Sequence, residues 1–320
     1  MKTKLIATIL ALFIVQVSFS QERETQKTPQ KEVPAATSNA RKPESVNGGH
    51  IDAQALISVS KPVIDNKENG KVNWTEQYVE ATGTSFMDFE KFKLEGQAAD
   101  MAKRGAIVIA QRNLLEIIEG VRVTSQTVVK DLVTESDIIM TRLDGKIKGA
   151  QIVGEPVVTK TSVKVTLRVP IYDQQKGIAP IVQQAMTDKD LELGKRISQN
   201  NQASLKSGTT EELSAVAFDF KGNTYNPSIF PKFVDKDGKV ILDLTEYYNP
   251  ETGEFPKYLQ LTKDIFKETK FKEGVSIIDA LIDKDGNIKV DITKNDKVKK
   301  WFDTITNVVS KVAPFVISFI

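Results

Sequence analysis

The sequence contains no cysteine and only one histidine, His50. Without cysteine the protein can form neither a disulfide bond nor a thiolate nucleophile, and it cannot carry a lipid on an N-terminal cysteine. One histidine is too few for a zinc site built from several histidines. His50, the only histidine, lies in or beside a polar segment, so we expect it to be solvated, and we expect no histidine-dependent catalytic triad.

An excess of charge of either sign is also missing. The 320 residues include 44 Lys and Arg against 42 Asp and Glu, and two of the lysines fall within residues 1–20. The remainder is therefore formally neutral. Nucleic-acid binding depends on many cationic contacts to phosphates, so we expect no nucleic-acid partner.

The sequence motifs of several common catalytic and nucleotide-binding sites are absent as well. The chain has no GxxxxGK[ST], GxGxxG, GxSxG or HExxH pattern. These patterns mark phosphate-binding loops, dinucleotide sites, nucleophilic serines and zinc proteases. We expect no catalytic residue, no cofactor and no metal ligand.

The first 50 residues divide into two parts. Residues 1–20 combine Lys2 and Lys4 with an apolar run and small residues near position 20, which is typical of a secretory signal cleaved after Ser20. The apolar run is shorter than the roughly 20 residues of a membrane span, so we expect no transmembrane segment after cleavage. Residues 21–50 are polar, contain proline and predict a disordered tether.

Two patterned regions follow the tether. The first covers residues 51–187 and the second residues 213–320, with a polar linker at 188–212. Each is predicted to be an α+β domain in which helices cover an antiparallel sheet.

The first region alternates between helical and strand periodicity. Four alanines, Ala98, Ala102, Ala106 and Ala110, recur at intervals of four and give a helix one side that can approach a sheet closely. The predicted elements are a strand at 72–83, a helix at 94–119, a strand at 121–129, a short helix at 134–145, and a half-buried hairpin of 150–158 and 162–171 that turns near Thr161.

The second region contains an internal repeat, FVDKDGKVILDL at 233–244 and LIDKDGNIKVDI at 281–292. If Asp235 held the third place of an EF-hand loop, the first and twelfth would fall on Phe233 and Leu244, which offer no carboxylate. The second copy fails in the same way. Since Asp-Gly is a strong signal for a two-residue turn, we predict two hairpins.

The last part of the sequence predicts a helix at 294–312 and a buried strand at 314–320. The apolar side of the helix includes Trp301 and Phe302, with three lysines nearby. Such a helix could lie on an anionic membrane or cover a sheet. We favour packing on the sheet, because Asp296 and Asp303 dilute the charge.

The region from Trp74 to Ile171 resembles the LPP-twenty-type envelope lipoproteins and the N-terminal region of the flagellar assembly protein T, families of Gram-negative cells. The resemblance rests on packing positions rather than on a chemical motif. The residues that carry it are Trp74, Tyr78 and Gly83, the alanine series with RNLLEIIEGVRV, the segment SDIIMTRLDGKIKGAQIV, and the strand VKVTLRVP.

A second likeness covers AVAFDFKGNTYNPSIFPKFVDKDG, which is similar to a downstream segment of longer relatives with an Asp-x-Arg-Gly turn. Here Lys221 stands in place of the arginine, so no role of that arginine carries over. The lipoprotein members are anchored through a lipidated cysteine, which this sequence lacks. The resemblance therefore implies a relative without a lipid anchor.

Several polar and aromatic residues are candidates for a functional site. Asn113 lies in the apolar stripe of the predicted helix, and we expect its amide to bond backbone groups of an adjacent turn or strand. We expect Trp74 and Tyr78 to be core residues rather than the lining of a ligand groove. Glu251 and Glu254 are expected to be solvated rather than an acid/base pair.

These observations predict a non-catalytic cell-envelope protein that acts in structural assembly or protein–protein interaction. We expect it to be exported to the periplasm or the outer-membrane periphery of a Gram-negative cell. The expected partners are other envelope proteins, with flagellar basal-body components among those that the resemblance implies, and self-association stays open. A small-ligand or glycan-binding module is the alternative, and a carboxylate-dependent hydrolase is the third hypothesis.

Overall fold

The computed structural model describes residues 58–188, 215–248, 250–253, 255–262, 264, 275–296, 298–300, 302 and 316–319, all within one compact unit of residues 43–320. It contains helices and two sheets, which confirms the α+β class. The predicted signal peptide, the tether with His50, and the linker beyond residue 188 lie outside the described residues, so the domain boundaries stay predictions. No helix in the described part combines the length and apolarity that a membrane span requires.

The first sheet has the strand order β2-β3-β4-β7-β5, with β6 also paired to β7, and every pair is antiparallel. The predicted hairpin that turns near Thr161 is confirmed by the β6–β7 pair. The strands are β2 (Ile64–Lys67), β3 (Gly70–Asn73), β4 (Tyr78–Phe86), β5 (Gln151–Ile152), β6 (Val157–Val158) and β7 (Ser162–Pro170).

The single strand predicted at 72–83 is wrong, because a turn divides this segment between β3 and β4. Gln77, in the turn, has a φ of 61°, a left-handed conformation that ends a strand. Its carbonyl accepts from the Ile171 amide at 2.7 Å. Its side-chain amide donates to the carbonyls of Phe255 at 3.0 Å and Pro256 at 3.1 Å. These contacts hold the turn in a conformation that local β propensity does not reveal.

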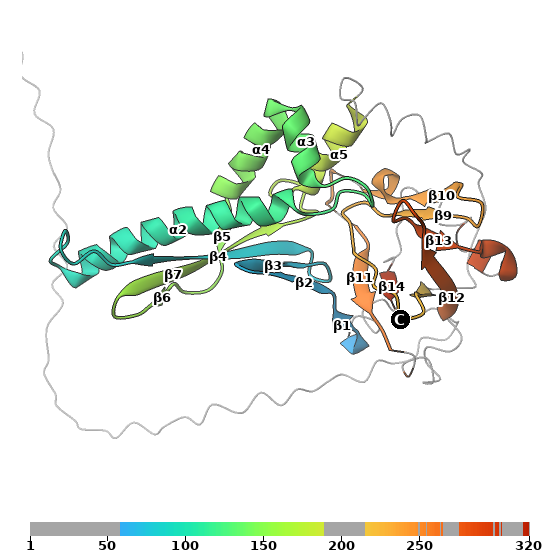
Figure 1. Ribbon diagram of the computed structural model, residues 1–320, viewed down its shortest axis with the longest axis horizontal. Coiled ribbons are helices and arrows are strands. Elements are labelled where there is room, and N and C mark those ends of the chain that lie inside the picture. Colours follow the sequence, from blue (N-terminus) through green and yellow to red (C-terminus); the bar gives the residue numbers. More distant parts are fainter. Residues whose placement is uncertain are drawn as a thin grey trace, which may run out of the picture. The chain divides into compact units, whose positions relative to one another are not determined.

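Helix α2 (Glu95–Glu119) confirms the predicted helix and packs against β4 and β7. Figure 1 shows it running along these strands. Its four spaced alanines are all buried, as a close approach to the sheet requires. At Gly83 of β4, a Cβ atom would lie only 2.2 Å from the Ala106 carbonyl oxygen. Gly83 therefore completes the close contact that the alanine series predicts.

Three further helices pack beside α2 or one another (Figure 1): α3 (Val129–Glu135), α4 (Asp137–Lys148) and α5 (Ala179–Thr187). The short helix predicted at 134–145 is confirmed as α4, which begins directly after the extended residue Ser136, whereas α3 was not predicted from the sequence. Gly145 does not end α4, which continues to Lys148. Glycine costs a helix interior only about 1 kcal/mol, which packing of the apolar side can offset.

The strand predicted at 121–129 is also wrong. This segment forms one isolated bridge, between Arg122 and Val128. Its carbonyls at Arg122 and Val123 accept instead from the amides of Ile229 and Phe230, each at 2.8 Å. A partner more than 100 residues away in sequence therefore determines the conformation, despite the local β-branched pattern.

The second sheet has eight strands in the order β1-β11-β14-β8-β12-β13-β9-β10. The antiparallel sheet predicted here is wrong, because four of its pairs are parallel: β11–β14, β14–β8, β8–β12 and β13–β9. Parallel neighbours require long connections, which a pattern of adjacent hairpins does not reveal. The strands are β1 (Lys61–Pro62), β8 (Ala215–Asp219), β9 (Lys232–Val234), β10 (Val240–Asp243), β11 (Lys257–Gln260), β12 (Val275–Ile282), β13 (Ile288–Val290) and β14 (Val316–Phe319).

Both predicted DKDG hairpins are present, as β9–β10 and β12–β13. Each has a three-residue loop rather than the predicted two-residue turn. Gly238 and Gly286 both have positive φ, and their amides donate to the carbonyls of Asp235 and Asp283 at 3.1 and 3.0 Å. A type I turn followed by a left-handed glycine produces this arrangement. Short 3-10 helices follow at Leu244–Tyr247 (η1) and Ile292–Lys294 (η3).

The end of the second region agrees with the predicted packing where it is described. Val298 and Phe302 of the predicted helix are buried, and Phe302 lies 5.8 Å from Phe233 between ring centroids. The final predicted strand is confirmed as β14, while its predicted burial stays a prediction. Trp301 and residues 303–315 lie outside the described residues.

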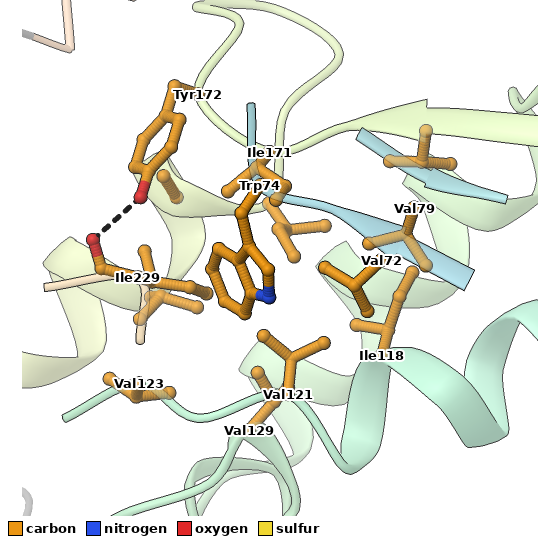
Figure 2. Packing of buried hydrophobic residues seen from close by; sticks show 14 of the residues in the cluster. Val72, Trp74, Val79, Ile118, Val121, Val123, Val129, Ile171, Tyr172 and Ile229 are labelled. Atoms are coloured by element: carbon orange, nitrogen blue, oxygen red, sulfur yellow. Dashed lines mark hydrogen bonds between the residues drawn. The ribbon is translucent and has the colours of Figure 1, made fainter. Parts of the chain in front are cut away.

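The buried residues of the two sheets form a shared hydrophobic cluster. The Tyr172 hydroxyl, just after β7, donates to the Ile229 carbonyl at 2.8 Å (Figure 2), and the Tyr248 hydroxyl donates to the Tyr172 carbonyl at 2.9 Å. The Thr75 hydroxyl donates to the carbonyl of Tyr258 in β11 at 2.7 Å. These buried bonds connect the β3–β4 turn to β11, and the end of β7 to the segments just before β9 and just after η1.

Candidate functional site

The face of the first sheet opposite α2 is called the open face. Side chains alternate along β4 and β7, so one set packs under α2 and the other lies on the open face. Thr84 and Lys164, cross-strand partners in the middle of this surface, are both exposed. The strand residues of the open face are Tyr78, Glu80, Thr82, Thr84 and Phe86 of β4, and Ser162, Lys164, Thr166 and Arg168 of β7.

Glu80 is the centre of an ion-pair network that crosses three strands. Its direct cross-strand neighbours are Lys71 of β3 and Arg168 of β7. The Arg168 Nε donates to Glu80 Oε1 at 2.7 Å, and the Arg168 Nη2 contacts the same oxygen. The Lys71 Nζ lies 3.2 Å from the other oxygen, Oε2. Both carboxylate oxygens are therefore engaged, although Glu80 is on a face without a packed helix.

The hydrogen bond with Glu80 raises the pKa of Lys71 above its usual value. Lys71 is thus charged throughout the physiological range. Because two cations share one carboxylate, the network keeps a net positive charge. Lys164 adds another positive charge to the same face.

Tyr78 forms an aromatic platform beside this network. The guanidinium carbon of Arg168 lies 3.8 Å from the centre of the Tyr78 ring, and the Lys71 Nζ lies 5.7 Å from it. Cation–π contacts of this kind orient both partners. The Asn73 amide also donates to the Tyr78 hydroxyl at 3.3 Å. The core position predicted for Tyr78 is wrong, since the ring is half-buried on the open face.

The other end of the open face is apolar. Phe86 is 75% exposed and Val157 is 59% exposed. Phe86 pairs with Ser162, and Val157 pairs with Lys164, so both side chains lie on the same side of the sheet. The open face thus extends about 27 Å along β4, from a cationic aromatic end to an exposed apolar end.

A large cavity of about 1210 Å³ lies beside the two DKDG hairpins. Its lining is mostly charged and polar rather than apolar. Asp235 Oδ1 accepts from the amides of Asp237 and Lys239, both at 2.9 Å. Asp283 Oδ1 accepts in the same way from Asp285 at 2.9 Å and Asn287 at 2.8 Å. The first aspartate of each repeat therefore stabilises its own turn.

The loop after α2 closes one side of this cavity. The Ser125 hydroxyl donates to Asn287 Oδ1 at 2.8 Å, and the Gln126 amide donates to Asp285 Oδ1 at 3.0 Å. In the described part of the chain, no group of three His, Cys, Asp or Glu residues could hold a metal ion. The contacts of Ser125 and Gln126 hold the second DKDG hairpin against the loop after α2. The cavity between them is not an apolar pocket with polar groups pointing into it.

The other residues that the sequence offered as candidates do not come together in one site. The Asn113 Nδ2 donates to the Thr82 carbonyl of β4 at 2.7 Å, which confirms its predicted bond to an adjacent strand. Trp74 is 3% exposed, which confirms its predicted core position, although it also borders a second, smaller cavity. Glu251 is exposed, and Glu254 lies outside the described residues, so the two are not brought together.

Lys221, at the position of the arginine in the resembled Asp-x-Arg-Gly turn, has a φ of 53°. Its Nζ lies 3.1 Å from Asp219 Oδ2 and 2.5 Å from Asp279 Oδ1, so it bridges the neighbouring strands β8 and β12. These ion pairs raise the pKa of Lys221, with the hydrogen bond to Asp279 as the main cause. In this protein Lys221 therefore has a structural role, since it joins two neighbouring strands through its ion pairs.

Sequence reasoning did not identify the Glu80 network. The alternation of residues 162–171 placed Arg168 on the polar side, but its partners depend on the register of β3 and β4. Comparison with models of known protein families matches none of them to this chain, and comparison with curated proteins also finds no match.

Proposed function

We propose that this protein is a non-catalytic component of the cell envelope that binds another protein through the open face. The observation that carries the proposal is that the open face has the Tyr78–Arg168–Glu80–Lys71 network at one end and the exposed Phe86 and Val157 at the other. Tyrosine and arginine are enriched among the residues that dominate protein–protein binding energy. A flat surface that combines an ordered polar area with an exposed apolar area is suited to a protein partner.

The charges of the open face favour an acidic partner. Lys71, Lys164 and Arg168 are cationic, and Glu80 is the acidic residue between them. A negatively charged surface on the partner would approach faster and bind more strongly at low salt. We therefore expect the partner to be an envelope protein with an acidic surface.

The geometry gives less support to the two alternatives. A glycan or small-ligand module would need convergent polar groups in an apolar pocket. The cavity beside the hairpins is lined instead by several lysines and by Asp283, which stabilises its own turn. A hydrolase of the third kind would need two carboxylates held close together in a cleft. The candidate pair gives no such arrangement, because Glu251 is exposed and Glu254 lies outside the described residues. The envelope location and a flagellar role rest on the predicted signal peptide and the sequence resemblance.

Site-specific photocrosslinking in intact cells tests the proposal. A crosslinking amino acid at Thr84, on the open face, should give a discrete product with another protein. The matched control is Glu116, exposed on α2. Tyr78→Ala should reduce the Thr84 product, and higher salt should reduce it in isolated envelopes. Equal products from both positions, or none from Thr84, would contradict the proposal; a product of twice the chain mass would identify a second copy as the partner.

A further inference from the structure

A second cavity, of about 640 Å³, lies between the β2–β3 hairpin, the loop after α2 and residues 224–227. We call it the Trp74 pocket. Val63, Val72 and Val121 supply apolar surface, and Asp65, Lys67 and Arg122 supply charged groups. Its volume is in the range of sites that hold small organic molecules.

Trp74 contributes a buried hydrogen-bond donor that has no acceptor. The residue is 3% exposed, and its indole Nε1 has no partner in the described part of the chain. A Tyr258 ring packs edge-on against the indole at 5.6 Å between centroids. Figure 2 shows the indole nitrogen turned toward Val72 and Val121, and both of these residues line the pocket.

This donor differs from the other buried atoms that lack a hydrogen bond. Asp243 Oδ2 is neutralised by the Lys232 ammonium at 2.7 Å, and Thr245 does not line the pocket. Buried polar groups nearly always have partners, because an unsatisfied one is costly. The Trp74 N–H is therefore the group whose partner would come from outside the protein.

The surroundings define the chemistry of such a partner. Indole nitrogen only donates, so the ligand must offer an acceptor. The indole nitrogen is surrounded by valine side chains, so the acceptor of the ligand would be buried in an apolar environment. A neutral carbonyl is favoured there over a carboxylate, since burying an ion costs far more than burying a hydrogen-bonded amide.

The rim of the pocket favours an anion. Asp65 and Lys67 form an ion pair at 2.8 Å and offset each other. The Arg122 side chain is exposed and uses one donor on the Ser125 carbonyl, at 3.2 Å, which leaves further donors in its fork. A carboxylate at the rim would meet this guanidinium.

We propose that the Trp74 pocket binds a small organic acid with an apolar body, whose neutral carbonyl accepts from the Trp74 indole and whose carboxylate pairs with Arg122. The nitrogen is shielded by neighbouring side chains, so binding includes a small rotation of Val72 or Val121. Side-chain adjustments of this size are common on binding. The site is separate from the open face and does not depend on it.

Titration of the purified protein with N-acetyl-L-leucine, followed through the two tryptophan indole N–H signals by NMR, tests the proposal. Trp301→Phe assigns the signals. We expect a saturable downfield shift of the Trp74 indole proton. N-acetyl-L-leucinamide, which keeps the carbonyl and lacks the charge, should shift the same signal with lower affinity.

Two variants at the rim of the pocket distinguish a direct contact between the ligand carboxylate and Arg122 from a general effect of positive charge. Arg122→Gln should weaken N-acetyl-L-leucine binding several-fold and leave the amide unchanged, whereas Lys67→Gln should change both little. Trp74→Phe removes the reporting N–H signal, so its affinities are measured by isothermal titration calorimetry beside those of the parent protein. This variant should bind both probes about 2- to 10-fold more weakly, as expected for one lost hydrogen bond. Absence of a saturable Trp74 shift with both probes, or equal effects of the two rim variants, would overturn the proposal.

Discussion

The two faces of the first sheet differ in how much change they should tolerate. On one face, Gly83 and the alanines of α2 bring two backbones close together. On the other, Tyr78, Glu80 and Arg168 form a polar network that no described helix covers in Figure 1. The same two strands thus contribute their alternate residues to a tight structural contact and to an exposed surface.

This difference separates the residues that build the fold from those available for binding. A packed contact without free space resists every added methyl group. An exposed sheet face accepts most substitutions with little change in stability. Mutations on the two faces therefore test whether the assignment of each face is right.

The largest effect is expected from Gly83→Ala. The new Cβ would lie 2.2 Å from the Ala106 carbonyl oxygen and 2.3 Å from the Ala110 amide nitrogen, both backbone atoms that cannot turn away. We expect a loss of about 3 kcal/mol in the free energy of unfolding, measured by urea denaturation. Gly96→Ala, where nothing lies within 4 Å of the new Cβ, is the control and should be neutral or slightly stabilising.

Ala106→Leu should follow, with a loss of about 1 to 3 kcal/mol, because Ala106 is fully buried against the sheet and the longer side chain needs space. Thermal and urea melts of the purified protein measure it. Arg104→Leu, exposed on the same helix, should change stability much less. Equal stability of Ala106→Leu and the parent would show that this side of α2 is not tightly packed.

Asn113→Ala should have a smaller effect, about 1 kcal/mol, because it removes one hydrogen bond to the Thr82 carbonyl. Chemical denaturation should detect the loss, while Arg112→Ala at the exposed neighbouring position serves as the control. If both substitutions cost the same, the effect belongs to the helix end in general, and the bond to β4 contributes little.

The smallest effect is expected on the open face. Thr84→Ala and Lys164→Ala should each change the free energy of unfolding by less than about 0.5 kcal/mol, because both side chains are exposed. The same denaturation assay compares them with Ala106→Leu. A loss as large as that of Ala106→Leu would mean that another part of the protein packs on this face.

The sequence predicted elements whose cause is local. The alanine series and Asn113 identified α2 and its contact with a strand, and alternation identified β7. The two DKDG repeats identified the hairpins, although the loop is one residue longer than expected, because Gly238 and Gly286 follow type I turns. In each case the deciding residues lie within a few positions of one another.

The remaining features depend on distant partners. Gln77 turns the chain where propensity favours a strand, and its side chain is held by Phe255 and Pro256. Residues 121–129 bond to Ile229 and Phe230 instead of joining a sheet. The Glu80 network needed the register of three strands, and the Trp74 pocket needed three separate segments, so neither site could be derived from periodicity.

The position of β14 has a consequence for the order of folding. Its Ser318 pairs with Ala217 of β8, roughly 100 residues earlier, and β14 also joins β11. The DKDG hairpins are local and should form within about 1 to 10 µs, whereas closing so long a loop carries a larger entropic cost. During synthesis from the N-terminus, β1 and β11 cannot join the rest of the sheet until residues 316–319 have emerged. The nascent chain should therefore stay incompletely folded, and open to chaperones, until that point.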